Sequence, residues 1–164
     1  MHLEPRIGFW QNPRGHNVTI SVAIAGGGPA GLTLAAALAQ QGGFEIAVYE
    51  RAEDHFRAET YNPDRSYTID MTGHGVRAAR FIGITDRFDT GLIHFKGLKI
   101  APHPWHRRLD VGFTEEPYQG KGRTGSRGDI CRCLQAHLPE RHADSVALRF
   151  GAEASIVDRG AHAS

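Results

Sequence analysis

Cysteine is scarce in this sequence, because the 164 residues include only Cys131 and Cys133. One residue separates the two within a predicted helix, so their side chains point to different faces and we expect no disulfide between them. Two thiols also do not complete a tetrahedral zinc site. Free thiols persist in reducing compartments, and we therefore expect a cytoplasmic location.

The sequence also lacks a large excess of charge of one sign and a long uninterrupted apolar run. The formal net charge is +1, which favours neither a nucleic-acid partner nor a charged membrane surface. The apolar stretch 22–39 carries Gly26-Gly27-Gly28-Pro29 in its middle, which indicates a strand, a turn and a helix and not a membrane span. Residues 1–17 lack the apolar core of a signal peptide and are interpreted as an extension. His103 and His106 have no third ligand at a matching position, and no metal site is predicted.

The most informative stretch is 22–31, VAIAGGGPAG, in which an apolar strand pattern meets a glycine-rich turn. Its glycines fit the G-x-G-x-x-G pattern of a dinucleotide-binding turn. Gly26 makes the tight turn, Gly28 lets a pyrophosphate approach the backbone, and Gly31 lets the helix pack against the strand. Pro29 suits the first helical turn, where a missing N–H costs nothing. Helix N-terminal amides would then face the phosphates.

The flanking sequence supports this interpretation on both sides. Residues 18–25 predict a buried parallel strand, and 44–49 predict a second strand that leads into Glu50, 24 positions after Gly26. An acid about 20 residues beyond the turn accepts hydrogen bonds from an adenosine ribose. The alternative is a glycine-rich connection with Glu50 as a surface acid. Arg51 faces the adenosine or a phosphate, or is a solvated side chain. The predicted apolar stripe of the helix consists of Leu32, Leu34, Ala35, Leu38 and Ala39.

The rest of the chain divides by composition into an excursion, 52–126, and a final helix with strands, 127–158. Within 126–138, Ser126 or Asp129 can cap a helix whose apolar positions recur every four residues. The stretch 101–127 is rich in proline and glycine and predicts loops with one strand at 109–113. The remaining predictions are strands at 65–70, 94–100, 146–150 and 154–157, a turn at 72–75, a helix at 76–82 and a short helical piece at 83–88.

Four segments together resemble the FAD-dependent aromatic-hydroxylase family, which includes 4-hydroxybenzoate and kynurenine 3-monooxygenases. They are VAIAGGGPAGLTLAAALAQQG with VYER, RSYTIDMTGHGVRAARFIGITDRF, SRGDICRCLQAHL and VALRFGAEASIVD, in family order. The resemblance implies an α/β, Rossmann-like FAD-binding fold with a parallel sheet. It also implies FAD as cofactor, NAD(P)H as electron donor and an aromatic small molecule as substrate. The residues implied to hold FAD are Gly26, Gly28, Pro29, Ala30 and Gly31 at the pyrophosphate, Glu50 at the ribose, Arg51 beside the adenosine and Arg127 at the dinucleotide.

Two later motifs of that family have no counterpart in this sequence, one linked to nicotinamide use and one that closes over the flavin. We therefore expect the amino-terminal part of a monooxygenase, which is inactive in isolation and exposes a sheet edge open to self-association. In such enzymes the cofactor carries the chemistry, so no catalytic residue is assigned. Two alternatives stay open: an NAD(P)-binding dehydrogenase domain, and a non-catalytic nucleotide-binding remnant.

Overall fold

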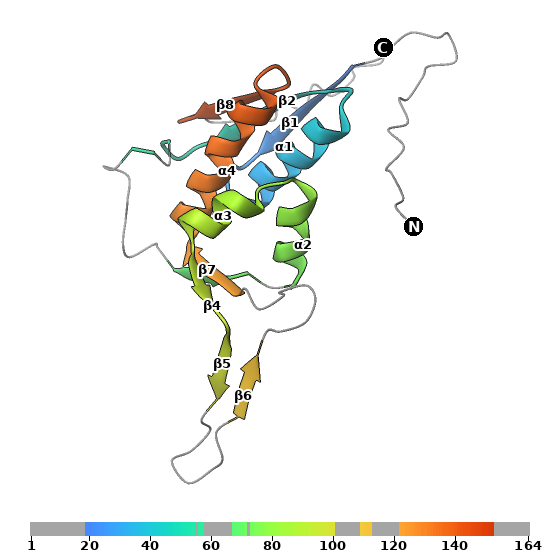
Figure 1. Ribbon diagram of the computed structural model, residues 1–164. Helices are drawn as coiled ribbons and strands as arrows, with labels where there is room; N and C mark the ends of the chain where they lie inside the picture. Colours follow the sequence, from blue (N-terminus) through green and yellow to red (C-terminus); the bar gives the residue numbers. More distant parts are fainter. Residues whose placement is uncertain are drawn as a thin grey trace, which may run out of the picture.

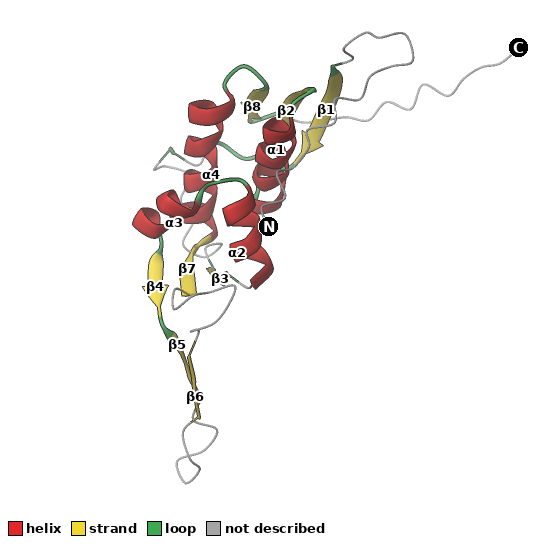
Figure 2. Ribbon diagram, turned by 45° about the vertical axis from the view of Figure 1, so that its right-hand side comes forward, coloured by secondary structure: helices red, strands yellow, loops and turns green. Residues whose placement is uncertain are grey.

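The described part of the chain has a parallel sheet at one end, helices in the middle and small antiparallel sheets at the other end (Figures 1 and 2). The two-stranded ribbon β5-β6 extends away from the helices in both views. None of the described helices is long and apolar enough to cross a membrane. The computed structural model describes residues 19–54, 56–57, 67–71, 73–100, 109–112 and 122–152.

The parallel sheet is built on a β-α-β unit. Strand β1 (Ile20–Ala25) leads into helix α1 (Pro29–Gln41), and the chain returns as strand β2 (Phe44–Glu50), which pairs in parallel with β1. Strand β8 (Val146–Phe150) pairs with the other side of β2, so the order is β1-β2-β8. Helix α1 ends where Gly42 takes a φ of 73°, which favours glycine. These observations confirm the predicted α/β class with a parallel sheet.

Helix α4 (Arg127–His142) is the longest described helix and begins in a capping box. The Ser126 hydroxyl accepts a hydrogen bond from the Asp129 N–H at 3.0 Å, and the Asp129 carboxylate accepts one from the Ser126 N–H at 3.2 Å. Partial burial raises the pKa of Asp129, but hydrogen bonds from Ser126 and Arg132 lower that pKa by more. This cap fixes the position of Arg127, the first helical residue.

The core lies between the parallel sheet and the helices. Helices α1 and α4 pack against each other, and α1 also packs against β2. The face of α4 that carries Ile130, Leu134 and Leu138 is buried, as its four-residue period predicts. The other buried apolar residues of this cluster are Ile24, Leu32, Ala35, Ala36, Ile46, Val48, Ala79, Ile82, Ile84, Phe88, Leu92 and Cys131.

A second, antiparallel sheet forms below the helices in the order β3-β7-β4. Its strands are β3 (Thr68–Asp70), β4 (Ile93–Phe95) and β7 (Gly122–Ser126). Strands β5 (Gly97–Ile100) and β6 (Leu109–Gly112) form a separate antiparallel pair. The short helices α2 (Gly73–Phe81) and α3 (Thr85–Gly91) precede β4.

Strand β7 was not predicted, because its sequence, GRTGS, has little strand propensity. The segment is a strand because it pairs with β3 on one side and with β4 on the other. A Cβ at Gly122 would lie 2.7 Å from the Phe95 ring, and one at Gly125 would lie 2.6 Å from Leu92, so neighbouring side chains occupy the space beside both glycines. Buried Arg123 forms an ion pair with Asp89 at 2.5 Å, which ties β7 to α3. The prediction of loops across this segment is therefore wrong.

Two predictions about burial in the β-α-β unit are also wrong. Strand β1 was expected to be buried, but within it only Ile24 is buried, because β1 is an edge strand of the described sheet. Leu34 was placed on the apolar stripe of α1, but its relative exposure is 49%. It lies two residues from buried Leu32, and that spacing puts the two side chains on opposite faces of a helix.

Several element boundaries also differ from the prediction. The turn expected at 72–75 is helical from Gly73, so α2 begins before the predicted 76, and α3 spans Thr85–Gly91 where a helical piece was expected at 83–88. The single edge strand expected at 94–100 is two strands, β4 and β5, which pair with different partners. Glycine-rich boundaries of this kind depend on packing more than on local preference. The predicted strand at 154–157 and the extension 1–17 lie outside the described residues.

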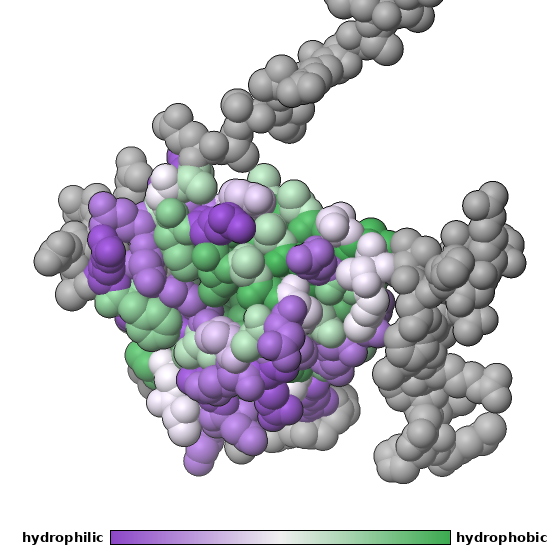
Figure 3. Space-filling model, turned by 90° about the horizontal axis from the view of Figure 1, so that it is seen from above, coloured by the Kyte–Doolittle hydropathy of each residue, from purple (hydrophilic) through white to green (hydrophobic). Residues whose placement is uncertain are grey.

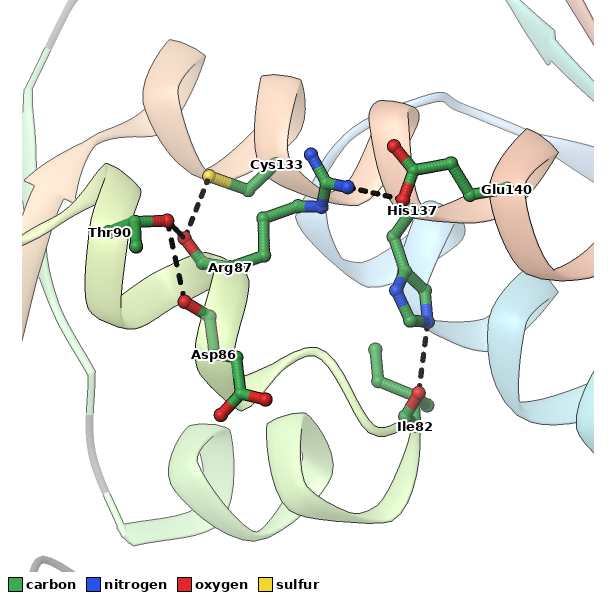
Figure 4. A network of polar contacts seen from close by, with 7 residues as sticks. All are labelled: Ile82, Asp86, Arg87, Thr90, Cys133, His137 and Glu140. Carbon is green, nitrogen blue, oxygen red and sulfur yellow. Dashed lines mark hydrogen bonds and ion pairs between the residues drawn. The ribbon is translucent and has the colours of Figure 1, made fainter.

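Polar contacts join helix α4 to the corner between α2 and α3 (Figure 4). The side chain of His137, on α4, is buried in this contact. Its Nε2–H donates to the Ile82 carbonyl at 2.9 Å. An ion pair between Arg87 and Glu140 links α3 to α4 nearby. Burial lowers the pKa of His137, and the hydrogen bond to Ile82 opposes this shift only in part; Arg141, His142 and Arg87 lower the pKa further.

The lowered pKa of His137 predicts that stability falls in mild acid. As the pH falls below about 6.5, the unfolded state takes up a proton on His137 that the folded state does not, so the free energy of unfolding decreases. We expect the melting temperature, followed by circular dichroism, to drop between about pH 7.5 and about pH 5.5, and to drop less in His137→Gln. His74→Gln, at an exposed position on α2, is the control; an equal drop in all three proteins would contradict this role of His137.

The free edge of β1 generates a second prediction. Among the described strands β1 pairs only with β2, and its sequence, ISVAIA, carries no charge. On the opposite edge, β8 carries Arg149, whose guanidinium lies 5.9 Å from the Tyr49 ring centre. Figure 3, which looks onto this end of the molecule, shows an apolar area beside polar surface. An uncharged strand edge is a template for pairing with another chain.

We expect the purified chain to self-associate through β1, and Ala23→Lys to shift it toward the monomer, since an edge lysine opposes strand pairing. Ala23 is exposed, so the lysine can be accommodated without loss of core packing. Sedimentation velocity over a concentration series measures the change. Ala147→Lys on the exposed side of β8 is the matched control. A wild-type chain that stays monomeric throughout the series would contradict the prediction.

Candidate functional site

The glycine turn between β1 and α1 has the geometry of a dinucleotide-binding turn. Gly26 takes a φ of 110°, and its N–H donates to the Tyr49 carbonyl at 2.7 Å. A Cβ at Gly31 would lie 2.0 Å from the Gly26 carbonyl oxygen, so only glycine lets α1 approach the strand so closely. Pro29 occupies the first helical turn, as predicted. The turn therefore directs the N-terminal end of α1 toward the carboxyl edge of the sheet.

Glu50 ends β2 beside this turn. Its Oε2 accepts a hydrogen bond from the Gly27 N–H at 2.7 Å, and its Oε1 accepts one from the Ala52 N–H at 2.9 Å. Two backbone donors thus fix the carboxylate. Each carboxylate oxygen accepts more than one hydrogen bond, so the group retains the capacity to accept from hydroxyls as well.

Arg127 reaches the same turn from the start of α4. A Cβ at Gly28 would lie 3.2 Å from an Nη atom of Arg127, so the guanidinium lies against the Gly28 backbone. The N-cap Gly28 has a φ of −78°, which any residue adopts, so a substitution there would be limited by Arg127 and not by backbone strain. A positive side chain and a helix N-terminus therefore meet at one point, which is the electrostatic requirement for binding phosphate.

Cys131 lies one turn further along α4 and is fully buried. Burial raises the pKa of its thiol to about 11; the positive charge of Arg127 lowers this pKa in part, and the negative charge of Glu50 raises it. A thiol with this pKa stays protonated at neutral pH and is a poor nucleophile. Cys131 therefore contributes to the packing of α4 in the core.

An apolar cavity of about 470 Å³ opens beside the turn. It extends from the first turn of α1 to β3, α2 and α4. This volume lies within the range of small-molecule sites, which are mostly apolar with a few polar groups. Its walls include Pro29, Ala30, Thr33, Ile69, Met71 and Ile130.

The structure brings several of the predicted site residues together. The glycines, Glu50 and Arg127 lie around the start of α1, and Arg51 is exposed in the bend that directly follows Glu50. Gly27 was missed, because the glycine pattern leaves its position open; the run of three glycines was the available signal. Among the described residues no group of three or more His, Cys, Asp or Glu side chains could hold a metal ion. His103 and His106 lie outside those residues.

The parallel β-α-β unit with its glycine turn and terminal acid defines a dinucleotide-binding class of fold. Residues 24–109 match the family described as the NAD(P)-binding Rossmann-like domain, and the match spans more than half of the chain. The chain therefore belongs to that family. The comparison with curated proteins found no match.

Solved structures of several oxygenases share this fold. PqsL from Pseudomonas aeruginosa, described as a probable FAD-dependent monooxygenase, is 20% identical with a TM-score of 0.63, over 85% of this chain and 35% of PqsL. The p-nitrophenol 4-monooxygenase PnpA from Pseudomonas putida is 16% identical with a TM-score of 0.61, over 82% and 31%. A 2-methyl-3-hydroxypyridine-5-carboxylic acid oxygenase is 24% identical with a TM-score of 0.58, over 83% and 32%. The chain spans about a third of the length of these structures.

The contact between Gly31 and the Gly26 carbonyl generates a prediction. Gly31→Ala places a methyl group 2.0 Å from a backbone oxygen, which cannot move without breaking the turn. We expect a loss of at least about 2 kcal/mol of stability, measured by urea unfolding. Gly75→Ala is the matched control, because its Cβ would lie 3.5 Å from Met71, an ordinary contact. Equal stability of the two variants would contradict the role of Gly31.

Proposed function

We propose that this chain binds FAD and forms the nucleotide-binding part of an NAD(P)H-dependent monooxygenase that acts on an aromatic small molecule. The observation that carries the proposal is the convergence of Glu50 and Arg127 on one glycine turn, with the Gly27 N–H 2.7 Å from the carboxylate. The match to the NAD(P)-binding Rossmann-like domain supports nucleotide binding. The monooxygenase fold of PqsL and PnpA supports the reaction class.

Each part of the site has a role in holding the dinucleotide. The N–H groups at the start of α1 and the Arg127 guanidinium would bind the pyrophosphate, with Gly26, Gly28, Pro29, Ala30 and Gly31 forming the turn. Glu50 would accept hydrogen bonds from the adenosine ribose. Arg51 would lie beside the adenosine. In this proposal residues 18–51 are the nucleotide-binding unit, 52–126 the excursion toward the substrate, and 127–158 the helix and strands that complete the site.

The apolar cavity favours FAD over a nicotinamide dinucleotide. It begins at Pro29 and Ala30, beside the proposed pyrophosphate position, and its apolar walls suit a flat ring system. Bound flavin supplies the electron transfer between NAD(P)H and oxygen. The protein contributes binding, orientation and exclusion of water, which requires no catalytic acid, base or nucleophile. The free thiols Cys131 and Cys133 fit a reducing, cytoplasmic compartment.

A dehydrogenase that binds NAD(P) is the second candidate, favoured by the description of the matched family. The glycine turn and a ribose-binding acid are common to both cofactors, so the turn alone does not separate them. The apolar cavity beside the turn supports FAD, because its walls could contact the flavin ring, a group that ADP and NAD lack.

We expect calorimetric titration to give a higher affinity for FAD than for ADP or NAD, and Glu50→Ala to weaken FAD binding by about tenfold or more, the value of a hydrogen bond to a charged group. Glu53→Ala, three residues further along and exposed, is the matched control. Tighter binding of NAD would support the dehydrogenase. Equal affinity for ADP and FAD would support a nucleotide-binding remnant, and no binding would overturn nucleotide recognition altogether.

A further inference from the structure

Tyr67 is an exposed aromatic residue that stands directly before strand β3. Its relative exposure is 61%. Among the described residues, the aromatic side chains of Phe56 and Phe81 are also more than half exposed. A single exposed apolar residue is ordinary on a protein surface, so exposure alone gives Tyr67 no role. Tyr67 differs from the other two in its contacts, because it lies between two parts of the candidate site.

The first of these parts is Arg127. Strands β3 and β7 are antiparallel, and their register places Thr68 opposite Ser126. The Arg127 N–H donates to the Tyr67 carbonyl at 3.3 Å, which extends this pairing by one residue. The guanidinium of Arg127 lies against the backbone of Gly28. Tyr67 therefore flanks the position proposed for the phosphates.

The second part is the apolar cavity. Ile69, Asp70 and Met71, which follow Tyr67 along the chain, belong to the cavity wall. Tyr67 lies two residues before Ile69, and side chains at this spacing project from the same face of a strand. The ring of Tyr67 is therefore placed next to the cavity, on the side of Arg127, although it is not itself part of the wall.

We propose that Tyr67 stacks on the ring system of a flavin whose phosphates are held at Arg127, and that this contact makes the chain select FAD over ADP. The inference rests on the proposed FAD binding. With the ribose at Glu50 and the phosphates at Arg127, the other half of the dinucleotide passes Tyr67 before it reaches the cavity. An aromatic side chain offers a flat conjugated ring a stacking contact that aliphatic side chains do not provide.

The test compares FAD with ADP, which ends at the phosphates. By calorimetry, Tyr67→Leu is expected to weaken FAD binding by about tenfold, the value of one stacking contact, and to change ADP binding by less than about twofold. Tyr67→Phe keeps the ring and is expected to keep the wild-type preference. Phe81→Leu is the matched control, since it removes an exposed aromatic side chain that is not part of the cavity wall.

The fluorescence of bound FAD gives a second readout, which a merely structural role of Tyr67 would not change. A phenol in contact with an isoalloxazine ring quenches its emission, because it donates an electron to the excited flavin. With all FAD bound, Tyr67→Phe is expected to raise the emission while the affinity stays unchanged, since a phenyl ring stacks but is much harder to oxidise. Phe81→Leu is expected to leave the emission as in the wild type.

The outcomes separate this inference from the function on which it rests. Because Tyr67 is exposed, its variants are expected to fold, and their melting temperatures check this. If the wild type prefers FAD and Tyr67→Leu keeps that preference, the stacking role is wrong while FAD binding stands. If Tyr67→Leu weakens FAD and ADP equally, Tyr67 acts on the start of α4 and the stacking role is again overturned. If the wild type binds FAD no more tightly than ADP, the proposed flavin binding and the inference fall together.

Discussion

The parallel pairing of β1 with β2 is the constraint on which the candidate site depends. Its register places Ala25 opposite Tyr49, so the glycine turn and Glu50 leave the sheet side by side at the same edge. The bond from the Gly26 N–H to the Tyr49 carbonyl continues this pairing into the turn. Glu50 then meets the Gly27 N–H without any further adjustment of the chain. A shift of one residue would turn the Glu50 side chain to the other face of the sheet.

Arg127, the other charged residue of the candidate site, lies far along the chain from Glu50, and its position depends on helix packing. Arg127 reaches the turn because α4 packs against α1 and because the Ser126–Asp129 capping box fixes where α4 begins. Strand β7 ends directly before this cap, and the buried Arg123–Asp89 ion pair anchors that strand. The antiparallel sheet therefore serves the nucleotide turn indirectly, since it sets the start of the helix that delivers the guanidinium.

The match to the NAD(P)-binding Rossmann-like domain and the fold shared with larger monooxygenases agree with this arrangement. The residues proposed to hold the dinucleotide lie in a chain that spans about a third of the length of those structures. The negative Glu50 lies at Gly27 and the positive Arg127 lies at Gly28, where one can accept from hydroxyls and the other can bind phosphate. In the proposed function, this division of charge would orient a dinucleotide in one direction along the edge of the sheet.

The sequence by itself determined the features that depend on local pattern. The strand, turn and helix around Gly26 and the period of α4 could be predicted, because the requirements of backbone conformation and amphipathic spacing are carried by neighbouring residues. Only the tertiary structure decided what depends on contacts between distant segments. Strand β7 forms because it pairs with β3 on one side and with β4 on the other, and the Glu50 carboxylate is held by the N–H of Gly27, 23 residues away. Such contacts cannot be predicted from the spacing of residues in the sequence, because each joins two segments that are close together only in the folded chain.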